Sequence, residues 1–67
     1  METLYLDDYF DARELNDFLY SYGWEMEKRE WSAVSTLITI SPLSDSYPLD
    51  ELVVRMSDIF FVQVKVV

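Results

Sequence analysis

The chain contains one glycine and two prolines, and these three residues constrain its fold more than any other feature of the sequence. Gly23, Pro42 and Pro48 are of the types at which helices and strands commonly end, so the segments between them are expected to be regular. With 67 residues the chain is too short for two domains and can build only one small core. Its apolar fraction of 51% is too high for a disordered segment. We therefore predict a single small domain over residues 1–67.

The segment before Gly23 predicts an amphipathic helix over residues 12–22. Its apolar residues recur at helical spacing, and polar residues occupy the other side. Asp11 followed three positions later by Glu14 is a capping-box pattern at the helix start. Gly23 stands where a residue in the left-handed conformation commonly ends a helix. The stripe that we expect to be buried consists of Ala12, Leu15, Phe18, Leu19 and Tyr22.

A second helix is predicted to begin at Pro48. Proline suits the first turn of a helix, and Asp50 and Glu51 follow it near the positive end of the helix dipole. The apolar residues again recur at helical spacing. The expected buried stripe consists of Leu49, Leu52, Val53, Met56 and Ile59.

Strands are predicted at both ends of the chain and in its middle. Residues 3–6 are short and β-prone, and the valines of residues 60–67 alternate with other residues as in a strand. Residues 24–40 leave two alternatives open. Alternation and β-branched residues favour a hairpin that turns near Arg29 and Glu30. Good helix formers in residues 25–33, and the lack of an Asn-Gly or Asp-Gly turn, favour a helix instead.

With the hairpin, the order of elements is β-α-β-β-α-β. This order resembles the split βαβ pattern of ferredoxin-like folds, an α+β architecture in which two helices cover one face of an antiparallel sheet. The resemblance implies that the last strand lies at one edge, beside the first strand, and that the second strand forms the other edge. Many unrelated functions use this architecture, so it implies no activity.

The missing residue types exclude most catalytic and metal chemistry. The chain has no cysteine and no histidine, so it has no disulfide, no thiol nucleophile, no Ser-His pair and no ordinary zinc site. Paired carboxylates act as acid and base when one of them is buried, but the acids of this chain are of the exposed, helix-capping kind. Their spacing does not match a calcium-binding loop. We predict a protein that is not an enzyme and holds no metal or cofactor.

The charge of the chain is strongly negative and unevenly distributed. Thirteen acidic residues outnumber five basic ones, which gives a formal net charge of -8 at pH 7. Residues 1–27 contain eight of the acids and a single base, Arg13. Because binding to nucleic acids and to anionic membranes depends on lysine and arginine, we expect neither of these partners. The sequence shows no basic leader and no long apolar run, so we expect a soluble, cytoplasmic protein.

This charge distribution leads to a hypothesis of function. We expect a non-enzymatic protein-protein interaction module that occupies a basic surface, in the sharper form a phage or mobile-element inhibitor that covers the nucleic-acid-binding surface of a host complex. The residues expected to bind the partner are Asp7, Asp8, Asp11, Glu14, Asp17, Glu25 and Glu27, with Tyr5 and Phe61 from the open face of the sheet.

Three alternatives stay open, of which the remotest is an acidic subunit that folds fully only within a larger complex. The acids can simply keep a small apolar domain soluble. The protein can also be a structural or regulatory homo-oligomer, for example a homodimer, that pairs through its C-terminal strand or its open sheet face.

Overall fold

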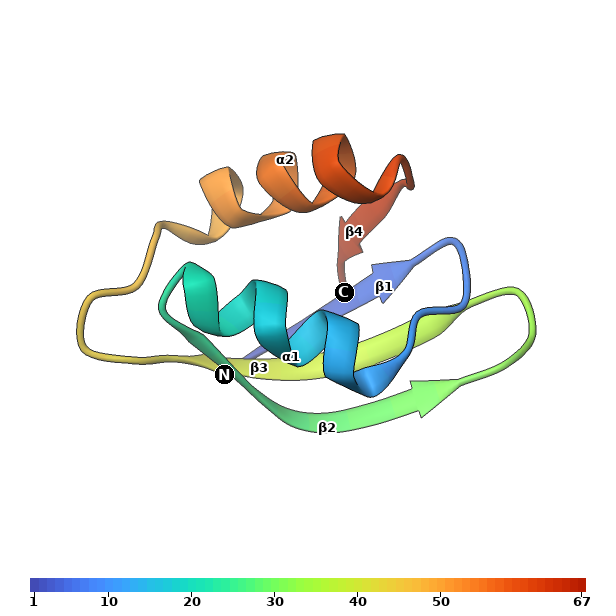
Figure 1. The fold of residues 1–67 in the computed structure, drawn as a ribbon, viewed down its shortest axis with the longest axis horizontal. Helices are drawn as coiled ribbons and strands as arrows, with labels where there is room; N and C mark the ends of the chain where they lie inside the picture. The colour runs from blue at the N-terminus through green and yellow to red at the C-terminus, as the bar shows by residue number, and fades with distance from the viewer.

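The computed structural model describes all 67 residues and contains one antiparallel sheet with both helices on the same face (Figure 1). The strand order is β2-β3-β1-β4. The predicted α+β class, element order and edge strands are therefore confirmed. The elements are β1 (Glu2–Leu6), α1 (Ala12–Ser21), β2 (Trp24–Trp31), β3 (Thr36–Pro42), α2 (Leu49–Phe60) and β4 (Val64–Val66).

The core lies between the sheet and the two helices. Every second residue of β1 and β3 faces the helices, because side chains alternate along a strand. Each helix contributes two fully buried residues, Leu15 and Leu19 from α1 and Leu52 and Met56 from α2. All four belong to the predicted stripes. The complete buried cluster is Leu4, Leu6, Leu15, Leu19, Trp24, Ile38, Ile40, Leu52 and Met56.

A row of aromatic rings joins the two helices. Phe60 of α2 packs against Phe18 of α1 with ring centroids 5.2 Å apart and against Phe10 at 4.8 Å. The row continues from Phe18 to Tyr22 at 4.7 Å and from Tyr22 to Tyr47 at 4.8 Å. Aromatic pairs at such distances add stability beyond the area they bury. The Phe18–Phe60 pair connects the two helices directly, and the other rings connect the segments that flank them.

Gly23 ends α1 as predicted, with a φ of 79° that favours glycine. A Cβ at this position would lie 2.5 Å from the carbonyl oxygen of Asp45. The predicted capping box at the start of the helix is wrong, because Asp11 is the N-cap residue but its side chain makes no cap hydrogen bond. The second helix begins near Pro48 as predicted, with Pro48 as the N-cap residue directly before its first turn.

The hairpin is confirmed, but its predicted turn is wrong. Instead of turning near Arg29 and Glu30, β2 continues to Trp31, which lies opposite Thr36. The turn spans residues 32–35. It is closed by the Ser32 N–H, which donates to the Ser35 carbonyl at 2.9 Å. Serine suits such turns because its hydroxyl bonds nearby backbone or side-chain groups.

A bulge near Glu27 shifts the pairing of β2 with β3 by one residue. Met26 lies opposite Ile40, whereas Lys28 lies opposite Thr39, so Glu27 is the extra residue. From this point on, the residues of β2 exchange faces relative to a regular strand. Arg29 therefore lies on the helix side of the sheet.

The C-terminal segment also differs from the prediction. Phe60 is the last residue of α2 rather than the start of a strand, and β4 contains only three residues. Two contacts explain the longer helix: the Phe60 ring packs on Phe10 and Phe18, and the Ser57 hydroxyl donates to the Val62 carbonyl at 2.8 Å. Ile59, expected in the buried stripe, is 50% exposed because it lies at the margin of that stripe.

Candidate protein-interaction surface

Three connections meet at one end of the molecule. Leu6 lies opposite both Thr36 and Val64, so the loops that follow β1, precede β3 and precede β4 are neighbours. The Asp7 N–H donates to the Gln63 carbonyl at 3.1 Å. We call this end the loop end and define it as residues 7–11, 31–35 and 61–63, at the right of Figure 1.

Two side chains hold the acidic loop of residues 7–11 against the sheet. Arg29 donates to the Phe10 carbonyl from Nε at 3.2 Å and from Nη2 at 2.6 Å. Thr36, the one buried polar residue, accepts from the Phe10 N–H at 3.0 Å and donates to the Asp8 carbonyl at 2.9 Å. Because these bonds fix its backbone, the loop presents its exposed side chains from defined positions.

Two exposed aromatic rings flank the same arginine. The Arg29 guanidinium lies 4.3 Å from the ring centroid of Trp31 and 5.4 Å from that of Tyr9. Such cation-π contacts hold the rings in place. Trp31 is nevertheless 61% exposed and Tyr9 41%. Tryptophan, tyrosine and arginine are the residues that most often dominate the binding energy of protein interfaces.

The acids around these rings are exposed, and none of them forms an ion pair. Asp7, Asp8 and Asp11 are exposed in the loop, and Glu14 and Asp17 are exposed on α1. The only ion pair of the molecule is elsewhere, between Lys28 Nζ and Glu30 Oε1 at 3.1 Å. Five neighbouring acids therefore produce a negative field beside exposed aromatic rings.

The structure divides the predicted site between two faces. Tyr5, Glu25 and Glu27 lie on the open face of the sheet, which the helices do not cover. The Ser41 hydroxyl donates to Glu27 Oε2 at 3.2 Å on that face. The predicted binding residues thus form one group at the loop end and on α1, and a second group behind the sheet.

Phe61 is the one predicted residue whose placement was wrong. It was expected on the open sheet face, but it follows α2 in the left-handed conformation, with φ 56° and ψ 46°. It lies outside the sheet because β4 begins only at Val64. Its side chain is 91% exposed and belongs to the loop end.

Trp31, Tyr9 and Arg29 were missed as site residues. The bulge at Glu27 places Arg29 and Trp31 on the helix side, and no residue pattern in β2 indicates a bulge. Tyr9 gave a weak signal, because it is an aromatic residue between acids in a short loop.

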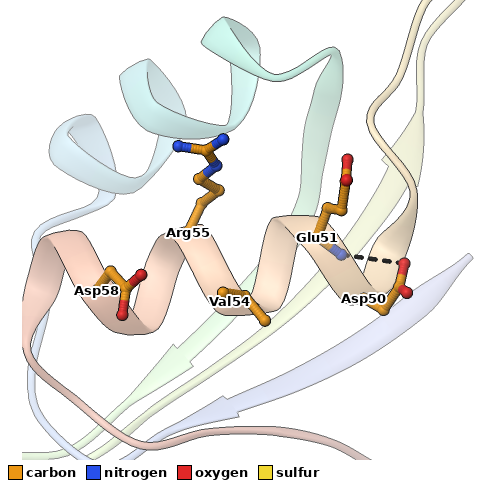
Figure 2. A pocket seen from close by; sticks show the side chains of 5 residues that line it. All are labelled: Asp50, Glu51, Val54, Arg55 and Asp58. Atoms are coloured by element: carbon orange, nitrogen blue, oxygen red, sulfur yellow. Dashed lines mark hydrogen bonds between the residues drawn. The ribbon is translucent and has the colours of Figure 1, made fainter.

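The surface has two hollows, and neither is an enclosed site. One lies on the outer face of α2, where all lining side chains are exposed (Figure 2). Its residues are Asp50, Glu51, Val54, Arg55 and Asp58. The other adjoins the loop end on the open sheet face and is lined by Tyr5, Glu30, Trp31, Ser32, Ser35 and Leu37. No three acidic side chains are placed so that they could hold a metal ion.

Comparison with protein-family models, curated proteins and solved structures gave no match to this chain. None of the helices has the length and apolar character needed to cross a membrane. The geometry and charge of the loop end and α1 are therefore the basis for proposing a function.

Proposed function

We propose that this protein is a non-enzymatic interaction module that binds a basic surface of another protein through its loop end and α1. The single observation that carries the proposal is a set of five exposed acids without ion pairs, three of them in the loop that Arg29 joins to the exposed Trp31 ring. The acids attract a basic partner over a distance, and aromatic rings supply the short-range contact.

The sharper form of the proposal concerns the kind of basic surface. A protein surface that binds nucleic acid presents lysine and arginine to phosphates. The acids of residues 7–17 offer such a surface an alternative source of negative charge. The protein then acts as a competitor of nucleic acid, as an inhibitor from a phage or mobile element would.

The test compares two triple variants that change the net charge equally. The first neutralises the α1 side with Asp11→Asn, Glu14→Gln and Asp17→Asn. The matched control neutralises acids outside the loop end with Asp45→Asn, Asp50→Asn and Asp58→Asn. Each variant changes the formal net charge from -8 to -5. None of these acids is ion-paired in the structure.

The original chain is immobilised, and a protein that it captures from a lysate of the source organism is purified. The affinity of this protein for the original chain and for each variant is then measured directly. We expect the α1 variant to bind at least about tenfold more weakly and the control to bind as the original chain does. The reason is that an ion pair across an interface forms only between charges that lie close together. Added salt and duplex DNA are both expected to weaken binding. Equal loss in both variants, or indifference to salt and DNA, would contradict the proposal.

A further inference from the structure

The two edges of the sheet differ in how they are protected from other strands. β2 has eight residues, of which five are charged and exposed or half-buried, and it contains a bulge. Charges and bulges are the usual means of preventing edge-to-edge pairing. β4 has no bulge, no proline and no acid, and its only charged residue is Lys65. It is the less protected edge of this sheet, because its short length and Lys65 are its only protective features.

The free hydrogen-bonding groups of β4 belong to two valines. The Val67 N–H donates to the Thr3 carbonyl at 2.8 Å, and the Gln63 carbonyl accepts from the Asp7 N–H. Odd-numbered residues of this segment thus bond to β1. In an antiparallel ladder the alternate residues point the other way, so Val64 and Val66 direct their N–H and C=O groups away from the sheet.

The segment that contains this edge is mostly apolar and has no acidic residue. Residues 59–67 contain no Asp or Glu and one lysine, in a chain whose net charge is -8. Val66 is 52% exposed and Val67 75%. For two copies of an acidic protein, this segment is the part of the surface where they approach with least repulsion.

We propose that β4 pairs with β4 of a second copy, antiparallel about a two-fold axis, to form one continuous sheet of eight strands. A two-fold contact needs a surface that is complementary to itself, and a strand with free N–H and C=O groups meets this condition. The register places Val64 opposite the partner's Val64. Val66 then lies opposite the partner's Val62, and Lys65 opposite the partner's Gln63.

Charge selects this register over its neighbour. A shift by two residues would place Lys65 directly opposite the partner's Lys65, and like charges directly opposite each other destabilise a strand pair. A shift by one residue would move the outward N–H and C=O groups out of alignment, because only even-numbered residues present them.

The first experiment measures the mass in solution by sedimentation over a range of micromolar concentrations. We expect a dimer whose population rises with added salt, because salt screens the repulsion between two copies of charge -8. This salt effect has the opposite sign to that of the proposed binding to a basic partner, so either idea can fail without the other. A monomer at every concentration and salt level would overturn the pairing.

Two variants with the same charge change separate the edge from the rest of the surface. Val66→Lys places a charge at the paired edge, and Val34→Lys places the same charge in the exposed hairpin turn. We expect Val66→Lys to raise the dissociation constant of the dimer at least about tenfold, because pairing would bury the new ammonium group. Val34→Lys is expected to leave it unchanged. Equal effects of the two variants would overturn the proposal.

The register can be read by cross-linking, because the chain has no cysteine of its own. Single variants Val64→Cys, Lys65→Cys and Val66→Cys are oxidised, and the rate of disulfide-linked dimer formation is compared. Hydrogen-bonded antiparallel residues have Cα atoms about 5.5 Å apart, within the range that a disulfide bridges. We expect the fastest cross-link at position 64. A faster cross-link at 65 or 66 would overturn the register.

Discussion

At the scale of single residues, both helices are followed by a residue in the left-handed backbone conformation, but the two residues are of very different types. α1 is followed by Gly23 and α2 by Phe61, both at positive φ. Glycine adopts this conformation without steric cost, whereas a residue with a Cβ is strained in it. Gly23 also has the backbone of Asp45 and Ser46 directly against it, whereas Phe61 is almost fully exposed. The two positions should therefore respond to substitution in opposite ways.

We expect Gly23→Ala to lower the free energy of unfolding by at least about 2 kcal/mol. The new Cβ adds the left-handed strain and meets backbone atoms at 2.5 to 2.9 Å that cannot move without displacing the β3-α2 loop. Urea unfolding followed by circular dichroism measures the change. A loss below about 0.5 kcal/mol, the size of an ordinary surface substitution, would contradict the close contact.

We expect Phe61→Gly to be more stable than Phe61→Ala by about 1 kcal/mol. Both variants lose the exposed ring, but only glycine removes the strain of the left-handed conformation. The same unfolding measurement gives the difference. If Phe61→Ala proved as stable as Phe61→Gly, the residue would not hold this conformation in solution.

At the scale of elements, one strand residue fastens a loop to the sheet. Arg29 reaches from β2 to the Phe10 carbonyl and stacks against Trp31 and Tyr9. A planar guanidinium makes both kinds of contact at once, and a lysine cannot. The position of the acidic loop relative to the hairpin thus depends on this side chain.

We expect Arg29→Lys to lower the free energy of unfolding by about 1 to 2 kcal/mol, because the Phe10 carbonyl loses two donors and the rings lose their stacked cation. Arg13→Lys on the exposed side of α1 is the control and should change it by less than about 0.5 kcal/mol. Near-ultraviolet circular dichroism reports the order of the aromatic side chains, Trp31 among them, and is expected to weaken only in the Arg29 variant. Identical spectra and stabilities for both would mean that the stack does not hold the loop end.

At the scale of the whole molecule, the net charge of -8 opposes folding as well as self-association. One ion pair is present, so most acids lack a nearby base. Self-repulsion of this kind is stronger in the compact state than in the extended chain, and salt screens it. The stability of the domain should consequently depend on ionic strength.

We expect the melting temperature of the Val66→Lys variant to rise as salt increases from about 0.01 M to 0.15 M, over which the Debye length falls from about 30 to 8 Å. This variant keeps dimer formation out of the measurement. Adding Asp11→Asn, Glu14→Gln and Asp17→Asn to it should reduce the slope. A melting temperature independent of salt in both proteins would show that the repulsion is negligible.

The α+β class, the order of elements and most of the core could be predicted from the sequence, because they follow from local periodicity. Leu15, Leu19, Leu52 and Met56 recur at helical spacing and are all buried. Gly23 marked a helix end because no other residue type adopts its backbone conformation as easily. The excess of acids in residues 1–27 is likewise a property of the chain alone.

The features that only the tertiary structure decided depend on contacts between distant segments of the chain. The bulge at Glu27 and the length of β2 follow from pairing with β3, and they bring Arg29 and Trp31 to the loop of residues 7–11. Phe60 joins α2 rather than a strand because its ring packs on Phe10 and Phe18. Local propensity does not predict these contacts, because each forms between residues far apart in the chain. The acids were therefore predictable, but the aromatic rings beside them were not.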